Sequence, residues 1–232
     1  MSAITMLQQS PQKGRDFTAS AAEREYGVGH YGSMPMADWL HMLVARGMAY
    51  HVSIGAFSTP ITGGGDGTIF DQDQPEGVLS VPSGFTMIPL RIHIQAQTPL
   101  LATDADESEI LIAVDRAASW DQTGTRTAEQ AFNLRTDMGD GSPVLCASAF
   151  TANCTNPTLA IELARSVMVG DVQGTPATAL YSKHELLYEP KYPPFIVGPA
   201  AIYLYWGGTV ATPGFAQCQF AAMPSTLVKA LV

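Results

Sequence analysis

The side chains that could do chemistry in this 232-residue chain are scattered rather than grouped. Nucleophilic catalysis needs a serine or cysteine beside a histidine, and a metal site needs several His, Cys, Asp or Glu side chains converging on one point. No G-x-S-x-G sequence occurs, and no Ser–His or Cys–His pairing is suggested. We therefore predict no catalytic residue, no metal ligand and no cofactor, and interpret the protein as a non-enzyme. The five histidines stand apart from one another: His30, His41, His51, His93 and His184.

The run from Gly27 to Gly32 satisfies the G-x-G-x-x-G pattern of dinucleotide-binding proteins. That site requires a buried strand before the glycines and a helix directly after them. Here polar residues precede the run and Pro35 follows it closely, so we interpret these glycines as part of an extended segment.

Two histidines have neighbours that partly match known metal-binding motifs. His184-Glu185 begins like a zinc-protease helix, but Tyr188 stands where the second histidine is required. A metal-binding jelly roll of the cupin type needs two histidines one residue apart, together with a glutamate and a distant histidine. Only His93 lies in a suitable strand, where Ile92 and Ile94 face the core, so we predict that His93 lies on the polar face.

Acidic side chains gather in two places along the chain. Carboxylates and backbone oxygens are the ligands that calcium prefers, but neither group follows the twelve-residue loop with glycine at its sixth position. We interpret both groups as solvated loops and keep calcium binding as the alternative. The first group is Asp104, Asp106, Glu107 and Glu109, and the second is Asp137 and Asp140.

The three cysteines, Cys146, Cys154 and Cys218, cannot all pair within one chain. Cys146 and Cys154 flank a predicted turn, and a bridge between them remains one alternative. We favour three reduced, partly buried thiols, which fits synthesis in a cytoplasm.

Composition indicates a globular protein with an unusual surface. Hydrophobic residues make up 46% of the chain, which is ordinary, whereas charged residues make up only 14% against a typical quarter. Sparse charge suggests that much of the surface meets other protein, with a hydroxyl-rich exterior as the alternative. The net charge of −9 disfavours nucleic-acid binding, because affinity for phosphate comes from Lys and Arg. No apolar run reaches the roughly 20 residues of a membrane span, and no signal-peptide pattern opens the chain.

We expect two parts, an extended N-terminal arm over residues 1–35 and a single domain over residues 36–232. Apolar residues at helical spacing predict a short amphipathic helix over Met36–Arg46, with Pro35 before it and Gly47 as its stop. Strand-like runs then follow at short intervals, separated by Gly, Pro, Asn and Asp. They cover residues 49–57, 68–70, 77–81, 85–97, 109–118, 130–135, 144–151, 158–169, 178–188, 200–206 and 215–222.

Two of these runs contain conflicting signals. Residues 85–97 alternate, with Leu90, Ile92 and Ile94 expected on one face, but Pro89 predicts an edge position or a bulge. Residues 158–169 have a helix-like pattern, yet Pro157, Gly170 and the β-branched residues favour a strand.

Strands at this spacing without crossover helices predict antiparallel sheets rather than βαβ units. The length and strand number fit a two-sheet jelly-roll sandwich better than an immunoglobulin-like domain of about 100 residues. We therefore predict an all-β jelly roll with at most two or three short helices.

The C-terminal third carries the most specific pattern. Tyr192-Pro-Pro-Phe195 leads through Gly198-Pro199 into one alternating strand, then a small-residue loop ending in Thr-Pro, then a last strand ending at Pro224. This resembles the closing hairpin of single jelly-roll major capsid proteins of icosahedral viruses of the bacterial or archaeal type. A polar arm, a short helix and a Gly-rich first loop precede it in similar order, so the layout extends over residues 36–224. The chain lacks the basic arm common in RNA-virus coats of this fold.

The resemblance implies a structural protein that self-assembles into the capsomers of an icosahedral shell. Its expected partners are other copies of itself, with a second capsid or vertex protein and an internal membrane left open and direct nucleic-acid binding disfavoured. Its expected location is the virion, after synthesis in the host cytoplasm. The alternative is a carbohydrate-binding or lectin-like β-sandwich, in which Trp39, Trp120, Trp206 or tyrosines stack on sugars.

Overall fold

The structure of the protein is a computed structural model that describes residues 39–56, 58–63, 72–100, 106–117, 125–151, 160–170, 180–208 and 211–229. Strands make up 61% of these residues and helices 8%, so the predicted all-β class is confirmed. The predicted arm, residues 1–35, and the strand predicted at 68–70 lie outside the described residues. The chain divides after Met42 into two units, and the second, residues 43–232, contains both sheets.

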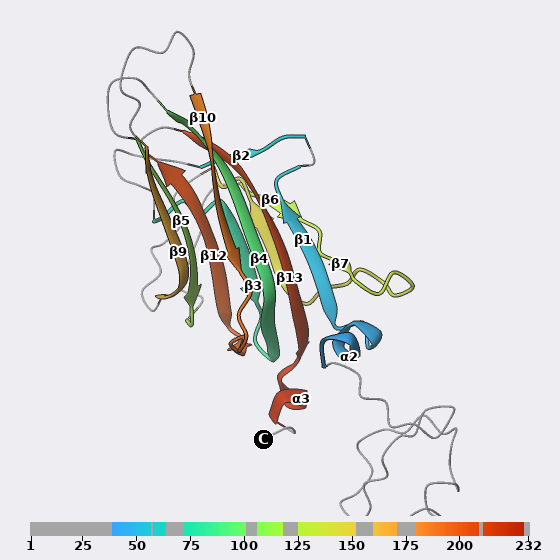
Figure 1. The fold of residues 1–232 in the computed structure, drawn as a ribbon. Helices are drawn as coiled ribbons and strands as arrows, with labels where there is room; N and C mark the ends of the chain where they lie inside the picture. Colours follow the sequence, from blue (N-terminus) through green and yellow to red (C-terminus); the bar gives the residue numbers. More distant parts are fainter. Residues whose placement is uncertain are drawn as a thin grey trace, which may run out of the picture. The chain divides into compact units, whose positions relative to one another are not determined.

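The described strands follow one another with short connections and two flanking helices (Figure 1). Most coincide with a predicted run, including the ambiguous one near residue 160, which is a strand. Their bounds are β1 (Ala49–Ile54), β2 (Ile61–Gly63), β3 (Gly77–Val81), β4 (Phe85–Leu100), β5 (Asp106–Asp115), β6 (Thr127–Glu129), β7 (Phe132–Asn133), β8 (Leu145–Ser148), β9 (Ala160–Gly170), β10 (Leu180–Tyr188), β11 (Ile196–Val197), β12 (Ala200–Gly208) and β13 (Thr212–Pro224). The helices are α2 (Trp39–Ala45) and α3 (Ser225–Lys229).

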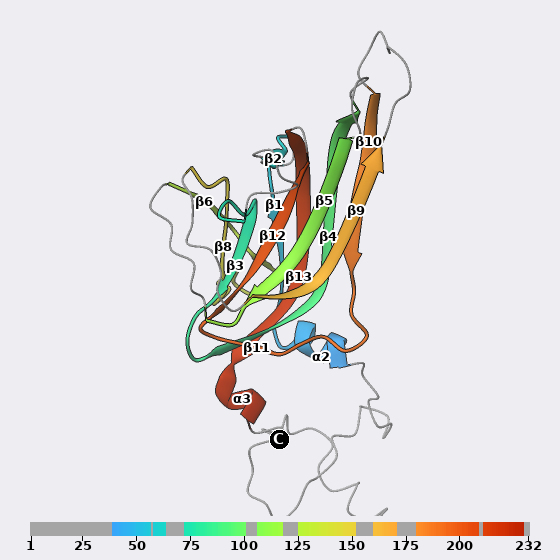
Figure 2. The ribbon, with the colours of Figure 1, turned by 90° about the vertical axis from the view of Figure 1, so that its left-hand side faces the viewer.

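The strands form two antiparallel sheets that face each other. The first has the order β10-β4-β13-β1-β7, with β2 beside β13 and β11 beside β4. The second has the order β6-β8-β3-β12-β5-β9. Figure 2, turned by 90° from Figure 1, shows the two layers with β9 and β10 at one side and β6 and β8 at the other.

The pairing of the eight longer sandwich strands is that of a jelly roll. These strands are β1, β3, β4, β5, β9, β10, β12 and β13. The outermost in sequence, β1 and β13, pair with each other, and so do β3 with β12, β4 with β10, and the two middle strands, β5 with β9. This is the pattern of one long hairpin rolled up so that its halves close two sheets. The predicted jelly-roll topology is therefore present.

The side chains of β12 alternate between the two faces of the second sheet, and an apolar cluster lies on each face. Ile202, Leu204 and Trp206 point into the core between the sheets, whereas Tyr203 and Tyr205 belong to a separate apolar cluster on the other face. Every residue of β12 is buried. Full burial of an aliphatic or aromatic side chain contributes about 1.5–3 kcal/mol relative to exposure, so this strand is a main source of rigidity.

Pro89 occupies a gap in the hydrogen-bonding ladder of the first sheet. The expected edge position is wrong, since β4 lies between β10 and β13. The expected bulge is confirmed, because the β4–β13 register shifts opposite Pro89, between Gln219 and Phe220. On the other side of β4, β11 pairs with residues 86–87 and β10 with residues from Ile92 onward, so Pro89 falls between the two partners. A residue without an N–H is tolerated in such a place.

The same bulge corrects the expected position of Leu90. Ile92 and Ile94 lie in the main core as predicted, but Leu90 packs in a different cluster with Ile88 and Met223. An extra residue in one strand of a ladder moves all later side chains to the opposite face. Sequence alternation alone therefore placed Leu90 on the wrong side.

The connection between β5 and β9 contains β6, β7 and β8, and we call residues 125–151 the insertion. The strand predicted over residues 130–135 is shorter in the structure, where β7 covers only Phe132–Asn133. The additional strand β6 lies before it, and β6 belongs to the second sheet whereas β7 belongs to the first. Ala131, which is buried, lies where the chain passes between the two sheets. The insertion thus extends both sheets on the side opposite β9 and β10.

Helix α2 ends at the predicted stop. Gly47 has φ of 68°, and its N–H donates to the carbonyl of Val44 at 2.9 Å. The N–H of Met48 donates to the carbonyl of Leu43 at 2.9 Å, and both side chains join the same apolar cluster. These two bonds form a Schellman motif, in which glycine takes the left-handed position at no steric cost.

Candidate functional site

The two histidines considered as metal ligands lie in neighbouring strands of the first sheet. His93 lies on the face opposite the buried Ile92 and Ile94, as predicted, with its Nε2 3.9 Å from a carboxylate oxygen of Glu185. Glu185 also pairs with Lys183. This is a polar cluster on the outside of the sheet.

His184 belongs to strand β10 and not to a helix, and its side chain is buried between the two sheets. Its Nδ1 lies 2.9 Å from the hydroxyl of Ser108 on β5, and its Nε2 lies 2.8 Å from the hydroxyl of Ser166 on β9. Burial lowers the pKa of the imidazole. The sequence suggested no Ser–His pairing, because the three residues lie on three different strands and Ser108 is 76 residues from His184.

A serine within hydrogen-bonding distance of a histidine is also the first element of a nucleophile–base pair. In this cluster, however, both ring nitrogens of the histidine are hydrogen-bonded to serine hydroxyls, and Ser108 has no exposed surface. A substrate would have no route to that hydroxyl. The arrangement instead acts as a polar link between β10 and the β5–β9 pair.

The first acidic group was interpreted as a solvated loop, which is wrong for its later residues, because β5 begins at Asp106. Successive side chains of a strand point to opposite faces, so Glu107 and Glu109 lie on the face opposite Ser108. Glu109 is buried and pairs with Arg165, whose other nitrogen lies 2.8 Å from Glu162. Asp104 lies outside the described residues.

In the second acidic group the carboxylates serve local structure. Asp137 forms two bonds with the guanidinium of Arg135, at 2.8 and 3.0 Å, which lower the pKa of the carboxyl. Asp140 accepts a bond from the backbone N–H of Asn133 at 3.1 Å. Across the part of the chain that the structure describes, no three His, Cys, Asp or Glu side chains are grouped to hold a metal ion.

Cys146 and Cys218 are free, buried thiols in the main core. Burial raises the pKa of Cys146 to about 12 and raises that of Cys218 as well. Thiols of this kind are inert, because the thiolate is the reactive form. Cys154 lies outside the described residues.

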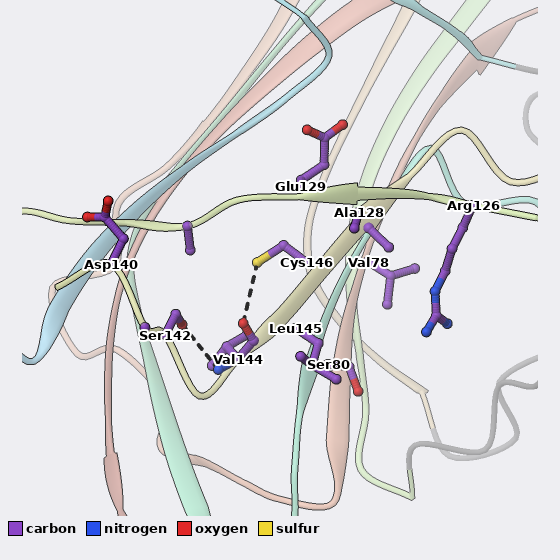
Figure 3. A pocket seen from close by; sticks show the side chains of 13 residues that line it. Val78, Ser80, Arg126, Ala128, Glu129, Asp140, Ser142, Val144, Leu145 and Cys146 are labelled. Atoms are coloured by element: carbon purple, nitrogen blue, oxygen red, sulfur yellow. Dashed lines mark hydrogen bonds between the residues drawn. The ribbon is translucent and has the colours of Figure 1, made fainter.

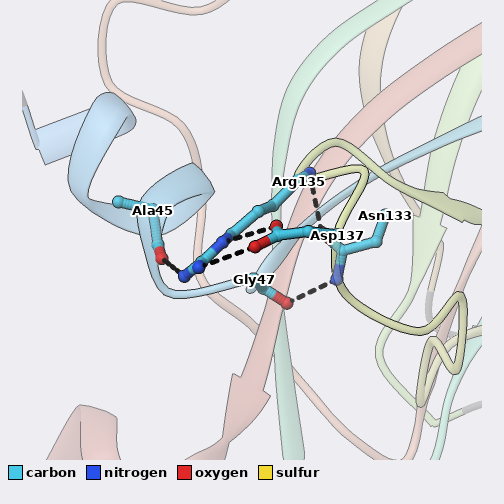
Figure 4. A network of polar contacts seen from close by, with 5 residues as sticks. All are labelled: Ala45, Gly47, Asn133, Arg135 and Asp137. Carbon is cyan, nitrogen blue, oxygen red and sulfur yellow. Dashed lines mark hydrogen bonds and ion pairs between the residues drawn. The ribbon is translucent and has the colours of Figure 1, made fainter.

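A network of polar contacts fastens the insertion to the turn between α2 and β1 (Figure 4). The side-chain amide of Asn133 donates to the carbonyl of Gly47 at 2.8 Å, and its oxygen accepts from the N–H of Arg135 at 2.9 Å. The guanidinium of Arg135 donates to the carbonyl of Ala45 at 2.5 Å while it also binds Asp137. The last carbonyls of a helix have no partner within the helix, so this cation caps α2.

Exposed apolar side chains gather on the insertion, at one side of the sandwich. Four belong to this group, which we call the insertion edge, and Leu145, at 63% exposure, is the most open. Beside Leu145 lies a pocket of about 340 Å³ between β3, β6 and β8 (Figure 3). Its charged lining residues are Arg126, Glu129 and Asp140. The insertion edge consists of Phe132, Leu134, Met138 and Leu145.

A second group of exposed apolar side chains lies at the opposite side of the sandwich, and we call it the β9 edge. Val169 is 60% exposed and Phe195 55%. Here a pocket of about 280 Å³ opens between β9 and the segment around β11, and the one charged residue that lines it is Arg116. Among the described strands, β9 is the last strand of the second sheet, and an edge strand with exposed aliphatic side chains is a ready site for association. The β9 edge consists of Ile161, Val167, Val169, Leu187, Phe195 and Val197.

Within the described residues, no helix is long and apolar enough to span a membrane. Comparison with models of known protein families and with curated protein sequences finds no match to this chain.

Proposed function

We propose that this protein is a structural protein, the major capsid protein of an icosahedral virus, which self-assembles into capsomers. The observation that carries the proposal is a jelly-roll sandwich with exposed apolar side chains at both lateral edges. Exposed apolar side chains on edge strands are available for contact between protein copies.

The composition supports the same function. A chain with only 14% charged residues leaves room on its surface for close packing between copies, and the buried core supplies a rigid building block. The partners are other copies of the chain, and the location is the virion after synthesis in a host cytoplasm. A second capsid or vertex protein and an internal membrane are compatible further partners, whereas the charge of −9 disfavours direct contact with nucleic acid.

The carbohydrate-binding alternative rests on a different feature. Trp206 has no exposed surface and donates from Nε1 to the carbonyl of Ile61 at 3.2 Å, so it is not available to stack on a sugar. Tyr192 and Phe195, however, are exposed in one proline-rich loop. A glycan-array signal that disappears in Tyr192→Ala would favour this alternative.

Light scattering and negative-stain microscopy of the purified protein test the proposal. We expect particles or multi-copy capsomers that persist or increase as monovalent salt rises, because salt screens the repulsion between copies of charge −9. Leu145→Asp is expected to abolish them, whereas Leu227→Asp, an exposed leucine on α3 outside both edges, is the matched control. A protein that stays monomeric at all concentrations and salts, or assembles only around added RNA or DNA, would contradict the proposal.

A further inference from the structure

We propose that the insertion edge of one copy packs against the β9 edge of the next copy, head to tail. This inference rests on the proposed function and specifies which surfaces meet. The strand order places the two edges at opposite ends of both sheets: β9 and β10 at one end, and β6 and β7 at the other (Figures 1 and 2).

Symmetry favours this arrangement over a two-fold one. In a two-fold contact, a patch on one copy packs against the same patch on the other copy. One dimer therefore covers only one of the two apolar edges and leaves the other in water. A head-to-tail contact covers an insertion edge and a β9 edge at every interface. Repetition of such a contact closes into a ring when the rotation per copy divides a full turn. Rings of identical copies are what a capsomer requires.

Charge at the two pockets is complementary. The pocket at the β9 edge has a single charged lining residue, the exposed Arg116. The pocket at the insertion edge is lined by two carboxylates, Glu129 and Asp140, and by one guanidinium, Arg126. The first pocket therefore carries one positive charge and the second a net negative charge of the same size. Two insertion-edge pockets facing each other would bring like net charges together, and so would two β9-edge pockets.

The shapes also correspond, because each edge has a pocket beside projecting apolar side chains. Leu145 projects from the insertion edge, while Ile161, Phe195 and Val197 line the opposite pocket. We infer that Leu145 of one copy enters this pocket, with Arg116 at the rim near the carboxylates of the neighbour. A buried aliphatic anchor surrounded by a charged rim is the usual anatomy of a protein interface.

Cross-linking between two variants, each with one accessible introduced cysteine, tests the inference. The background carries Cys154→Ser, since Cys146 and Cys218 are buried and unreactive. Leu145→Cys and Val197→Cys proteins, one of them tagged, are assembled together or alone and treated with a short bis-maleimide. We expect a cross-linked product between the two variants in the mixture and little from either alone. The double variant is expected to give a ladder of oligomers, and Leu227→Cys no product.

Each other outcome overturns the inference in a distinguishable way. A strong dimer from Leu145→Cys alone shows a two-fold contact. If normal particles form but no cross-linked product joins positions 145 and 197, the proposed function is retained and the pairing of these two edges is wrong. Monomers throughout, in the unsubstituted protein as well, remove both.

A charge variant provides a second readout. Arg116→Glu is expected to raise severalfold the protein concentration needed for half-assembly, because it places like charges at the contact. Lys229→Glu, on α3 like the control position Leu227, is the matched control. Equal effects of the two substitutions would overturn the assigned role of Arg116. Far-UV circular dichroism checks that both variants remain folded.

Discussion

The imidazole of His184 and the hydroxyl of Ser108 are joined by a hydrogen bond of 2.9 Å, although 76 residues separate them in the chain. With the bond to Ser166 on the other ring nitrogen, this contact ties β10 in one sheet to β5 and β9 in the other. A neutral imidazole suits the position, since one nitrogen donates while the other accepts.

The burial of His184 predicts an acid sensitivity. Its pKa in the folded protein is lower than the ordinary 6.5, so the unfolded state binds the proton more readily. Stability from this group is therefore complete above about pH 6.5 and is lost as the pH falls below it. Thermal unfolding at pH 7.5 and 5.5 measures the effect. We expect His184→Gln to lower the melting temperature at pH 7.5 and to show a smaller further fall at pH 5.5 than the unsubstituted protein. An identical acid-induced fall in both would contradict the assignment.

The glycine at the end of α2 predicts a graded series of substitutions. Gly47→Ala is expected to cost about 1–2 kcal/mol of unfolding free energy, because φ of 68° is unfavourable for alanine. A Cβ there would also displace the flexible side chain of Met138. Gly84→Ala has a similar φ of 85° but open space around the new methyl group, and Gly139→Ala has open space without a positive φ. In urea unfolding, the loss of unfolding free energy should be equal or slightly larger for Gly47→Ala than for Gly84→Ala, and near zero for Gly139→Ala. A large loss at Gly139 would show that the backbone argument is wrong.

The contacts that fasten the insertion to the turn between α2 and β1 predict unequal contributions to stability from two nearby residues. The side chain of Asn133 is buried and makes two hydrogen bonds, so Asn133→Ala should cost about 1–3 kcal/mol. Arg135 is 43% exposed at its side chain, so Arg135→Ala should cost less unfolding free energy than Asn133→Ala despite its bidentate partner. Denaturant melts of both variants give the comparison. A larger loss for Arg135 would mean that its bond to the carbonyl of Ala45 dominates these contacts.

The core thiols predict chemical inertness. With iodoacetamide at pH 8, Cys146 and Cys218 should remain unmodified in the native protein, because burial raises both pKa values and blocks access. Both should react fully in guanidinium chloride. Peptide mass spectrometry reads each site separately. Rapid native modification of either cysteine would contradict the described packing of the core.

Local patterns in the sequence were sufficient for the elements of the fold. Alternation located the strands around Ile92, Ile112 and Leu204, and Gly47 marked the end of the helix, because side-chain period and backbone freedom are properties of neighbouring residues. The same logic placed His93 on the polar face. The charge of −9 and the sparse charged residues also follow from composition alone.

Only the tertiary structure decided which strands pair and what they bring together. The bulge opposite Pro89, which moves Leu90 to the other face, depends on the register with a strand about 130 residues later in the sequence. The His184 cluster depends on three strands in two sheets, and the two apolar edges depend on where the insertion joins them. Such contacts are set by burial and ladder formation between remote segments, so no pattern within a single strand encodes them.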